Sequence, residues 1–304
     1  HMIDSLNIPI NYISGSSIGA ISAALYATGH SVYEIDKIGS DTKWKEIFSQ
    51  SRKRSELYFF QKKDNAKFQL AFNLRGFKPT SPISITNGQY SYDNLINIFS
   101  NYLNVNNYDD LIIPFRCNAT DIISGEEIIF SRGSIPTALR ISTSIPTVFS
   151  PIEYENQLLV DGGLINNLPV NLVENLGAEY IISSNVMSQN KSKDEIVDIF
   201  NMVFKIIDLY GDKNEQINLA KSDILVSPNL DRMNVVDYNI RDIYKMKLSG
   251  KKAAYQNINK FLALENKNNK LINLASIYQD TINIDSIILS PDMIDDALIN
   301  NLFK

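Results

Sequence analysis

The sequence predicts an α/β fold with a mainly parallel sheet, and three observations lead to this prediction. Short apolar, β-branched segments alternate along the chain with segments of helical periodicity. The 304 residues are 44% hydrophobic, which is enough to form a sizeable core. The stretch "NYISGSSIGAISAALYATGH", from Asn11 to His30, joins a strand, a turn of small residues and a helix in one unit.

The first elements carry clear local signals. Residues 8–14 predict a short buried strand, and residues 17–28 predict a helix that ends at Gly29, a favoured residue just past a helix. Ser31 and Glu34 form a capping box that begins a second helix. The chain therefore starts with a strand followed by two helices.

The remaining elements follow the same alternation. Residues 41–78 mix basic and aromatic residues, which fits an exposed loop and hairpin or, alternatively, a rim that touches a lipid surface. The later expected elements are, in order, a helix (91–103), two strands joined at Ser124-Gly125 (111–133), a helix between two Ile-Pro pairs (134–152), a hairpin, loop, helix and strand (154–186), an amphipathic helical region (192–223), a strand (224–228) and a mostly helical region (240–264).

Composition excludes some classes of function and leaves the compartment open. The formal net charge is −5, so the chain has no global field that attracts nucleic acid. No apolar run approaches the ~20 residues that a membrane helix needs. His1-Met2 resembles a cloning scar, so the natural N-terminus, and with it an export signal, stays undetermined. The single cysteine, Cys117, is interpreted as a small buried hydrophobic residue.

The turn within the first unit contains a G-x-S-x-G pattern, Gly15-Ser16-Ser17-Ile18-Gly19. A nucleophilic serine needs a tight strand-to-helix turn, where glycines avoid clashes. The N-terminus of the following helix directs N–H groups toward the serine and favours developing negative charge. Ser17 is therefore the candidate nucleophile, with helix capping by Ser16 or Ser17 as the alternative.

The proton acceptor for Ser17 cannot be a histidine of this chain. His1 belongs to the apparent scar, and His30 lies beyond the helix, roughly 18–20 Å away at about 1.5 Å per residue. A Ser-His-Asp triad would need a histidine from a partner chain. Asp161 ends an apolar strand and precedes Gly162-Gly163, where a desolvated base is expected. The alternative is a plain Asp-Gly hairpin turn.

Taken together, the two motifs resemble those of the patatin-like phospholipases. "YISGSSIGAISAALYATG" carries the nucleophile motif and "LLVDGGLINNLPV" the D-G-G motif of that family. "IPTALRISTSIPTVFSPI" is similar to its R-A-S-x-x-x-P-x-x-F-x-P pattern, with Ile141 in place of a small residue. By this resemblance Ser17 is the nucleophile and Asp161 the general base of a Ser-Asp dyad. The resemblance covers about residues 3–264, taken as the catalytic domain.

The resemblance implies a three-layer α/β fold and lipid or phospholipid acyl esters as substrates. It also implies an acyl-enzyme mechanism of the phospholipase A or lysophospholipase type, without metal or cofactor. Acyl transfer to an alcohol would use the same residues. A peripheral membrane contact is compatible with these expectations, and the oligomeric state stays open. The apolar residues proposed to line the substrate pocket are Ile18, Ile145, Val148 and Phe149.

One departure from the family pattern concerns the N-terminus. The family has a first strand and a glycine-rich oxyanion loop before the nucleophile, whereas no glycine precedes Gly15 here. This absence predicts weak or no ester hydrolysis by this chain, and it supports an alternative role as a catalytically silent binding or structural module. It also predicts that another segment or chain fills the empty strand position.

The C-terminal region is expected to lie outside the catalytic domain. Residues 265–279 are polar and are interpreted as a linker. Residues 280–304 predict a strand, a turn and a capped helix. They are similar to the start of a small β-α module of outer-membrane assembly proteins, which would imply export through a bacterial cell envelope. The alternative is a C-terminal helix that packs on the main domain.

Overall fold

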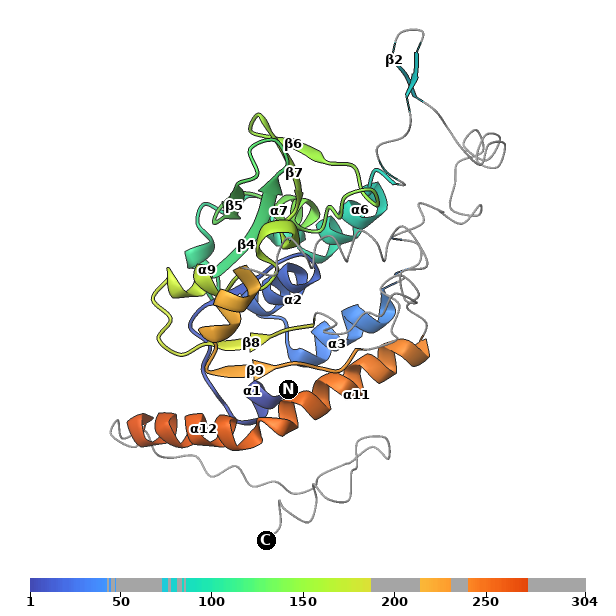
Figure 1. The fold of residues 1–304 in the computed structure, drawn as a ribbon. Coiled ribbons are helices and arrows are strands. Elements are labelled where there is room, and N and C mark those ends of the chain that lie inside the picture. Colours follow the sequence, from blue (N-terminus) through green and yellow to red (C-terminus); the bar gives the residue numbers. More distant parts are fainter. Residues whose placement is uncertain are drawn as a thin grey trace. The chain divides into compact units, whose positions relative to one another are not determined.

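The computed structural model describes residues 1–42, 44, 47, 73–75, 78–80, 84, 86–186, 214–230 and 240–272. The chain divides into two compact units, His1–Glu265 and Asn266–Lys304, and the fold below is that of the first (Figure 1). Among the described helices, none combines the length and the apolar character that crossing a bilayer requires. Most of residues 41–78, the greater part of 192–223 and all of 280–304 lie outside the described residues.

The central sheet has five strands in the order β1-β4-β7-β6, with β5 paired to β4. Only the β1–β4 pair is parallel, and the β4–β5, β4–β7 and β6–β7 pairs are antiparallel. A parallel pair β8–β9 and an antiparallel pair β2–β3 stand apart from this sheet. The strands are β1 (Ile13–Gly15), β2 (Asn73–Arg75), β3 (Lys78–Thr80), β4 (Phe115–Asp121), β5 (Glu127–Phe130), β6 (Ile152–Tyr154), β7 (Gln157–Asp161), β8 (Ile182–Ser184) and β9 (Ile224–Val226).

The α/β class is confirmed, but the prediction of a mainly parallel central sheet is wrong. The physical reason is the two tight hairpins, because strands joined by a short turn must run antiparallel. The turn between β6 and β7 places Glu155 at φ 49° and Asn156 at φ 64°, as a two-residue hairpin loop requires. The β4–β5 turn closes around Asp121 and Gly125, with Gly125 at φ 74°.

One face of the central sheet is apolar and is covered by helices α2 and α7. Phe115, Cys117 and Ala119 alternate along β4 toward this face and are fully buried. Alanines of α2 pack against them, and the small side chains let the helix approach the strands closely. The helices around this core are α2 (Ile18–Ala27), α3 (Val32–Asp41), α6 (Gln89–Ile98) and α7 (Ile135–Ser142), with 3₁₀ turns η2 (Ser100–Tyr102) and η3 (Tyr108–Asp110).

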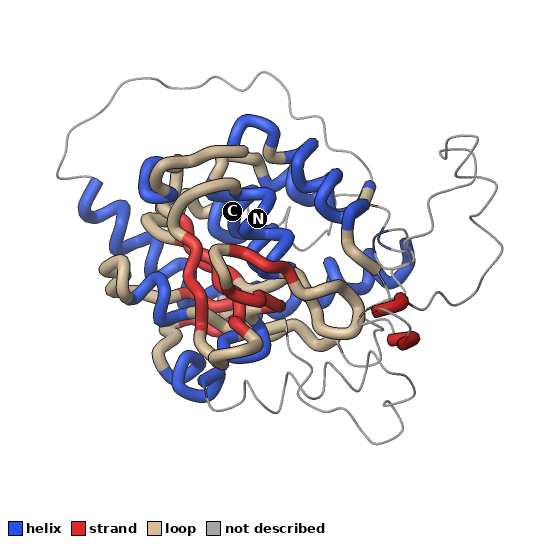
Figure 2. The backbone as a smooth tube through the Cα atoms, turned by 90° about the horizontal axis from the view of Figure 1, so that it is seen from above, coloured by secondary structure: helices blue, strands red, loops and turns tan. Residues whose placement is uncertain are grey.

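The opposite face of the sheet is polar and is covered by two short helices, α8 (Gly163–Asn166) and α9 (Val170–Glu174). Asn118 of β4 donates its side-chain N–H to the carbonyl of Asn166, and the Ser14 hydroxyl donates to the carbonyl of Pro169. Helices therefore lie on both faces of the sheet, in three layers. Figure 2 shows the strands gathered between these helices.

A second small core joins the start of the chain to the later elements. Ile8, Ile224 and Phe261 are buried together, and residues of helix α1 (Met2–Ser5) pack around them. The predicted helical region 240–264 is present as α11 (Ile240–Gln256) and α12 (Ile258–Ile272). Helix α12 continues into the predicted linker, residues 265–279, and the strand expected over 8–14 is confined to β1.

Candidate active site

Ser17 lies at the sharp turn from β1 into α2, as the G-x-S-x-G pattern predicts. Its backbone adopts φ 53° and ψ −127°, a left-handed conformation that is uncommon outside glycine and costs about 1–3 kcal/mol. A Cβ at Gly15 would lie 2.3 Å from the carbonyl oxygen of Gly19, so this turn requires glycine at position 15. A Cβ at Gly19 would meet no atom within 4 Å, so Gly19 relieves no clash in this structure.

The hydroxyl of Ser17 donates a hydrogen bond to Asp161, with 2.6 Å between Oγ and Oδ2. Two strands bring the pair together. Gly15 of β1 lies beside Cys117 of β4, and Asp161 at the end of β7 lies beside Ala119 of the same strand. Two residues 144 positions apart in sequence therefore meet over the middle of β4.

The turn after Asp161 begins helix α8 and is not a hairpin turn. The Gly163 N–H donates to Asp161 Oδ1 at 2.8 Å, so the carboxylate is held at both oxygens. A Cβ at Gly162 would lie 2.4 Å from Oδ1 of Asn118, and a Cβ at Gly163 would lie 2.7 Å from Oδ1 of Asn167. The pair of glycines lets this turn pack directly on the polar face of the sheet.

The environment of Asp161 suits a proton acceptor near neutral pH. The side chain is only 2% exposed, and this burial raises its pKa to about 6. The hydrogen bonds from the Ser17 hydroxyl and the Gly163 N–H favour the charged carboxylate and act in the opposite direction. A base with a pKa near the working pH is the most effective at moving a proton.

The proposed pocket residues separate into two groups. Ile145, Val148 and Phe149 form one small buried cluster together with the partly buried Ile47 and Leu164. Leu164 follows Gly163 directly, so this cluster adjoins the turn that holds Asp161. Ile18 is 43% exposed and lies outside the cluster. The structure thus brings three of the four predicted residues together and leaves Ile18 apart.

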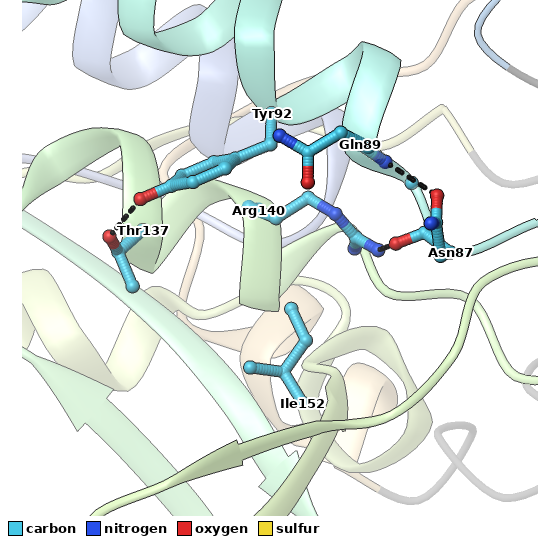
Figure 3. A pocket seen from close by; sticks show the side chains of 7 residues that line it. Asn87, Gln89, Tyr92, Thr137, Arg140 and Ile152 are labelled. Carbon is cyan, nitrogen blue, oxygen red and sulfur yellow. Dashed lines mark hydrogen bonds between the residues drawn. The ribbon is translucent and has the colours of Figure 1, made fainter. Parts of the chain in front are cut away.

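A cavity of about 260 Å³ lies between helices α6 and α7 (Figure 3). Ser17 and Asp161 do not line it. In Figure 3 the Tyr92 hydroxyl points to Thr137 and the Arg140 guanidinium points to the backbone of Asn87. The lining residues are Asn87, Gly88, Gln89, Tyr92, Thr137, Arg140 and Ile152.

Two further residues that the sequence analysis considered, His30 and Cys117, lie outside the pair formed by Ser17 and Asp161. His30 lies past the far end of α2, where Nδ1 is 3.0 Å from the Thr28 hydroxyl, so it does not reach Ser17. Cys117 is fully buried in the sheet, and burial raises the pKa of its thiol. Among the described residues, no group of three or more His, Cys, Asp or Glu side chains is placed to hold a metal ion.

Comparisons with known proteins agree with the motifs. The family model "Patatin-like phospholipase" matches residues 2–173. The chain is 26% identical over 181 residues to "Lysophospholipase NTE1" of Scheffersomyces stipitis, a match that covers 60% of this chain and 10% of that protein. It is 51% identical over 55 residues to an NTE family protein of Mycobacterium tuberculosis, covering 18% of this chain and 9% of that protein.

Among solved structures, VipD from Legionella pneumophila matches with a TM-score of 0.44 and 13% identity, over 86% of this chain and 64% of that one. The chain spans about a tenth of the length of the curated relatives named above. The family model covers more than half of the chain, including both Ser17 and Asp161. The chain belongs to the patatin-like phospholipase family.

Proposed function

We propose that this chain is a serine hydrolase of lipid acyl esters, of the phospholipase A or lysophospholipase type. The observation that carries the proposal is the 2.6 Å hydrogen bond from the Ser17 hydroxyl to the buried Asp161 carboxylate. Membership of the patatin-like phospholipase family supports lipid esters as substrates. The similarity to a protein named lysophospholipase supports a lysophospholipid as the first substrate to test.

In the first half of the reaction Ser17 is acylated. Its Oγ attacks the ester carbonyl carbon while its proton passes to Asp161 Oδ2 along the existing hydrogen bond. The tetrahedral intermediate then collapses, the bond to the alcohol breaks, and the alcohol leaves with the proton from Asp161. The product at this stage is an acyl ester on Ser17.

In the second half Asp161 activates water. The carboxylate accepts a proton from a water molecule, whose oxygen attacks the acyl carbonyl of the Ser17 ester. Collapse of this second intermediate breaks the bond to Oγ, and Asp161 returns its proton to Ser17. The fatty acid is released and the dyad returns to its starting state. One carboxylate therefore serves both half-reactions.

The negative charge that develops on the carbonyl oxygen of the tetrahedral intermediate needs a hydrogen-bond donor, and the first turn of helix α2 provides a backbone N–H. Ile18 is its first residue, and within the described part of the chain its backbone N–H has no hydrogen-bond acceptor. This N–H follows the nucleophile directly and lies at the positive end of a ten-residue helix. It is the candidate for stabilising the oxyanion.

Reaction with a fluorophosphonate probe tests the proposal, because the probe reacts with activated serine hydroxyls. We expect labelling at Ser17, identified by peptide mass spectrometry, together with slow release of fatty acid from lysophosphatidylcholine micelles, in line with the weak hydrolysis that the sequence predicts. Ser17→Ala abolishes both, and Asp161→Asn lowers the labelling rate on the order of 10²- to 10⁴-fold. Ser22→Ala is the matched control, because Ser22 lies five residues after Ser17 on α2 and its hydroxyl donates to the Ile18 carbonyl.

The outcome that contradicts the proposal is a folded protein that leaves Ser17 unlabelled and releases no fatty acid. That outcome would favour the alternative role as a catalytically silent binding or structural module. Hydrolysis that persists in Ser17→Ala at the rate of the unmodified chain would contradict the assigned nucleophile. Diacyl phosphatidylcholine as a second substrate distinguishes phospholipase A from lysophospholipase specificity.

A further inference from the structure

Both members of the dyad are hydrogen-bonded to one short segment, the C-terminal end of α7 and the residues just after it. The Ser17 backbone N–H donates to the Ser142 hydroxyl at 3.0 Å. The Asp161 backbone N–H donates to the Ser144 carbonyl at 3.0 Å. Because Ser142 and Ser144 are two residues apart, the relative position of Ser17 and Asp161 is set through this segment.

We infer that Ser142 is a positioning residue, whose hydroxyl fixes the backbone of Ser17 so that Oγ reaches Asp161. This inference rests on the proposed function of the dyad. The Ser142 side chain makes no described hydrogen bond to the reacting atoms of the proposed mechanism; the one described hydrogen bond of its hydroxyl is from the Ser17 N–H. It acts through that contact alone.

The conformation of Ser17 explains why such a contact is needed. A residue at φ 53° and ψ −127° keeps that conformation only where its surroundings hold it. The Ser17 side chain does not cap α2, since no side-chain cap bond is formed there. Ser142 is fully buried, so water cannot replace its hydroxyl as the acceptor for the Ser17 N–H.

The supporting segment is itself fixed. Arg140 is only 4% exposed and donates through its guanidinium to the Ser144 hydroxyl at 2.7 Å and to the Asn87 carbonyl at 2.8 Å. The Ser144 hydroxyl also donates back to the Arg140 carbonyl at 2.8 Å. These contacts hold the backbone on both sides of Ser142, so the segment keeps the Ser142 and Ser144 anchors at a fixed separation.

The test compares two variants that each remove one hydroxyl from the same helix end. Ser142→Ala removes the acceptor for Ser17 and keeps the Cβ. Thr143→Val is the control, because the Thr143 hydroxyl donates only to the carbonyls of Leu139 and Arg140 within its own helix. With a soluble short-chain ester we expect Ser142→Ala to lower kcat on the order of 10- to 100-fold at unchanged KM, and Thr143→Val to change kcat less than twofold.

The pH profile separates positioning from a general loss of stability. The hydrogen bond from Ser17 lowers the pKa of Asp161, so a displaced Ser17 raises the pH at which activity is half-maximal. We expect this upward shift in Ser142→Ala and not in Thr143→Val. Neither variant alters the titratable groups on the elements packed against β7, which are Arg116, Cys117 and Asp121 of β4, Glu153 and Tyr154 of β6, and Arg140 of α7.

Amide hydrogen exchange of Ser17, followed by NMR, provides a readout that needs no turnover. The inference predicts faster exchange at Ser17 in Ser142→Ala than in the unmodified chain or in Thr143→Val. If the unmodified chain shows no labelling at Ser17, the proposed function fails, while faster exchange still supports the positioning contact. Unchanged exchange at Ser17 in folded Ser142→Ala, or a kcat within twofold of the unmodified chain, overturns the inference.

Discussion

At the scale of single residues, Asp161 combines a chemical advantage with a cost in stability. A carboxylate at the end of a buried strand loses its hydration, and among the described residues the Ser17 hydroxyl and the Gly163 N–H compensate through hydrogen bonds. The net effect is a pKa of about 6, compared with 3.8 for a free side chain. The same burial that makes Asp161 a suitable base therefore makes its charged form unfavourable in the folded protein.

The pH dependence of activity and stability follows from this shift. Asp161 must be charged to accept a proton, so the acylation rate should rise through about pH 6 and level off above it. Because the folded pKa is raised, the group's contribution to stability is complete below pH ~4 and is lost as the pH rises through about 6.

Replacing Asp161 with Asn removes this cost. We expect Asp161→Asn to be more stable than the unmodified chain at pH 8, by on the order of 2–3 kcal/mol, and equally stable near pH 4. Urea unfolding at both pH values measures the difference. A difference in stability that is the same at pH 4 and pH 8 would show that burial does not act on this carboxylate as described.

At the scale of elements, a buried cation joins α7 to the loop before α6. The Arg140 guanidinium lies 4.8 Å from the centre of the Phe149 ring and donates to the Asn87 carbonyl. A Cβ at Gly88 would lie 2.0 Å from the guanidinium, so the loop packs directly against it. Burial lowers the pKa of Arg140 to about 10, and no described carboxylate pairs with it. The N–H groups of the planar guanidinium therefore connect α7 to the loop before α6 through hydrogen bonds.

A lysine in place of Arg140 would keep the positive charge but could not donate to the Ser144 hydroxyl and the Asn87 carbonyl in the same geometry. We expect Arg140→Lys to be destabilised by about 2–4 kcal/mol, because the Ser144 hydroxyl and Asn87 carbonyl lose their donors in a buried site. The fall in melting temperature measures the loss. Arg116→Lys is a suitable comparison, since Arg116 pairs with the exposed carboxylate of Asp109, and a lysine can keep that single ion pair, so we expect a smaller loss of about 0–1 kcal/mol. Equal losses in the two variants would contradict the assigned role.

At the scale of the whole molecule, a chain of buried amides connects three parts of the fold. The Asn118 and Asn166 side chains both donate to Glu127 Oε1, at 2.8 and 2.7 Å. Asn166 also donates to Asn171 of α9 and accepts from Asn218 in the helix 214–220. The network ties the polar face of the sheet, α8 and α9 to a helix that follows later in the chain.

Asn166 is the centre of this network, so removing its side chain should lower the free energy of unfolding of the whole fold. Asn166→Ala removes the donor to Glu127 and leaves Asn218 and Asn171 without a buried partner. At about 1–3 kcal/mol for an unsatisfied buried group, we expect a destabilisation of at least 2 kcal/mol in urea unfolding. Asn175→Ala is the control, because Asn175 lies just after α9 and outside the network. If Asn166→Ala changed only amide hydrogen exchange near α8 and left the free energy of unfolding unchanged, the proposed role in the stability of the whole fold would be contradicted.

The sequence alone determined the family resemblance and the two candidate residues of the proposed dyad. The spacing of Gly15, Ser17 and the small residues of α2 requires a sharp strand-to-helix turn, and these signals are local in sequence. The sequence contains two histidines, and neither is placed to act as the base for Ser17. The only Gly-Gly pair of the sequence directly follows Asp161 and indicates the end of a strand there. The capping box at Ser31 and Glu34 is likewise a local signal, and it is confirmed.

The tertiary structure decided what depends on distant contacts. Hairpin pairing made the central sheet mostly antiparallel, and the pairing of β1 and β7 with β4 set the distance between Ser17 and Asp161. Ser142 gave no signal of its own in the sequence beyond its place in the segment similar to the R-A-S-x-x-x-P-x-x-F-x-P pattern, because its proposed role depends on a partner 125 positions away. The fixed backbone of Ser17 and the raised pKa of Asp161 arise only when the folded chain buries them together.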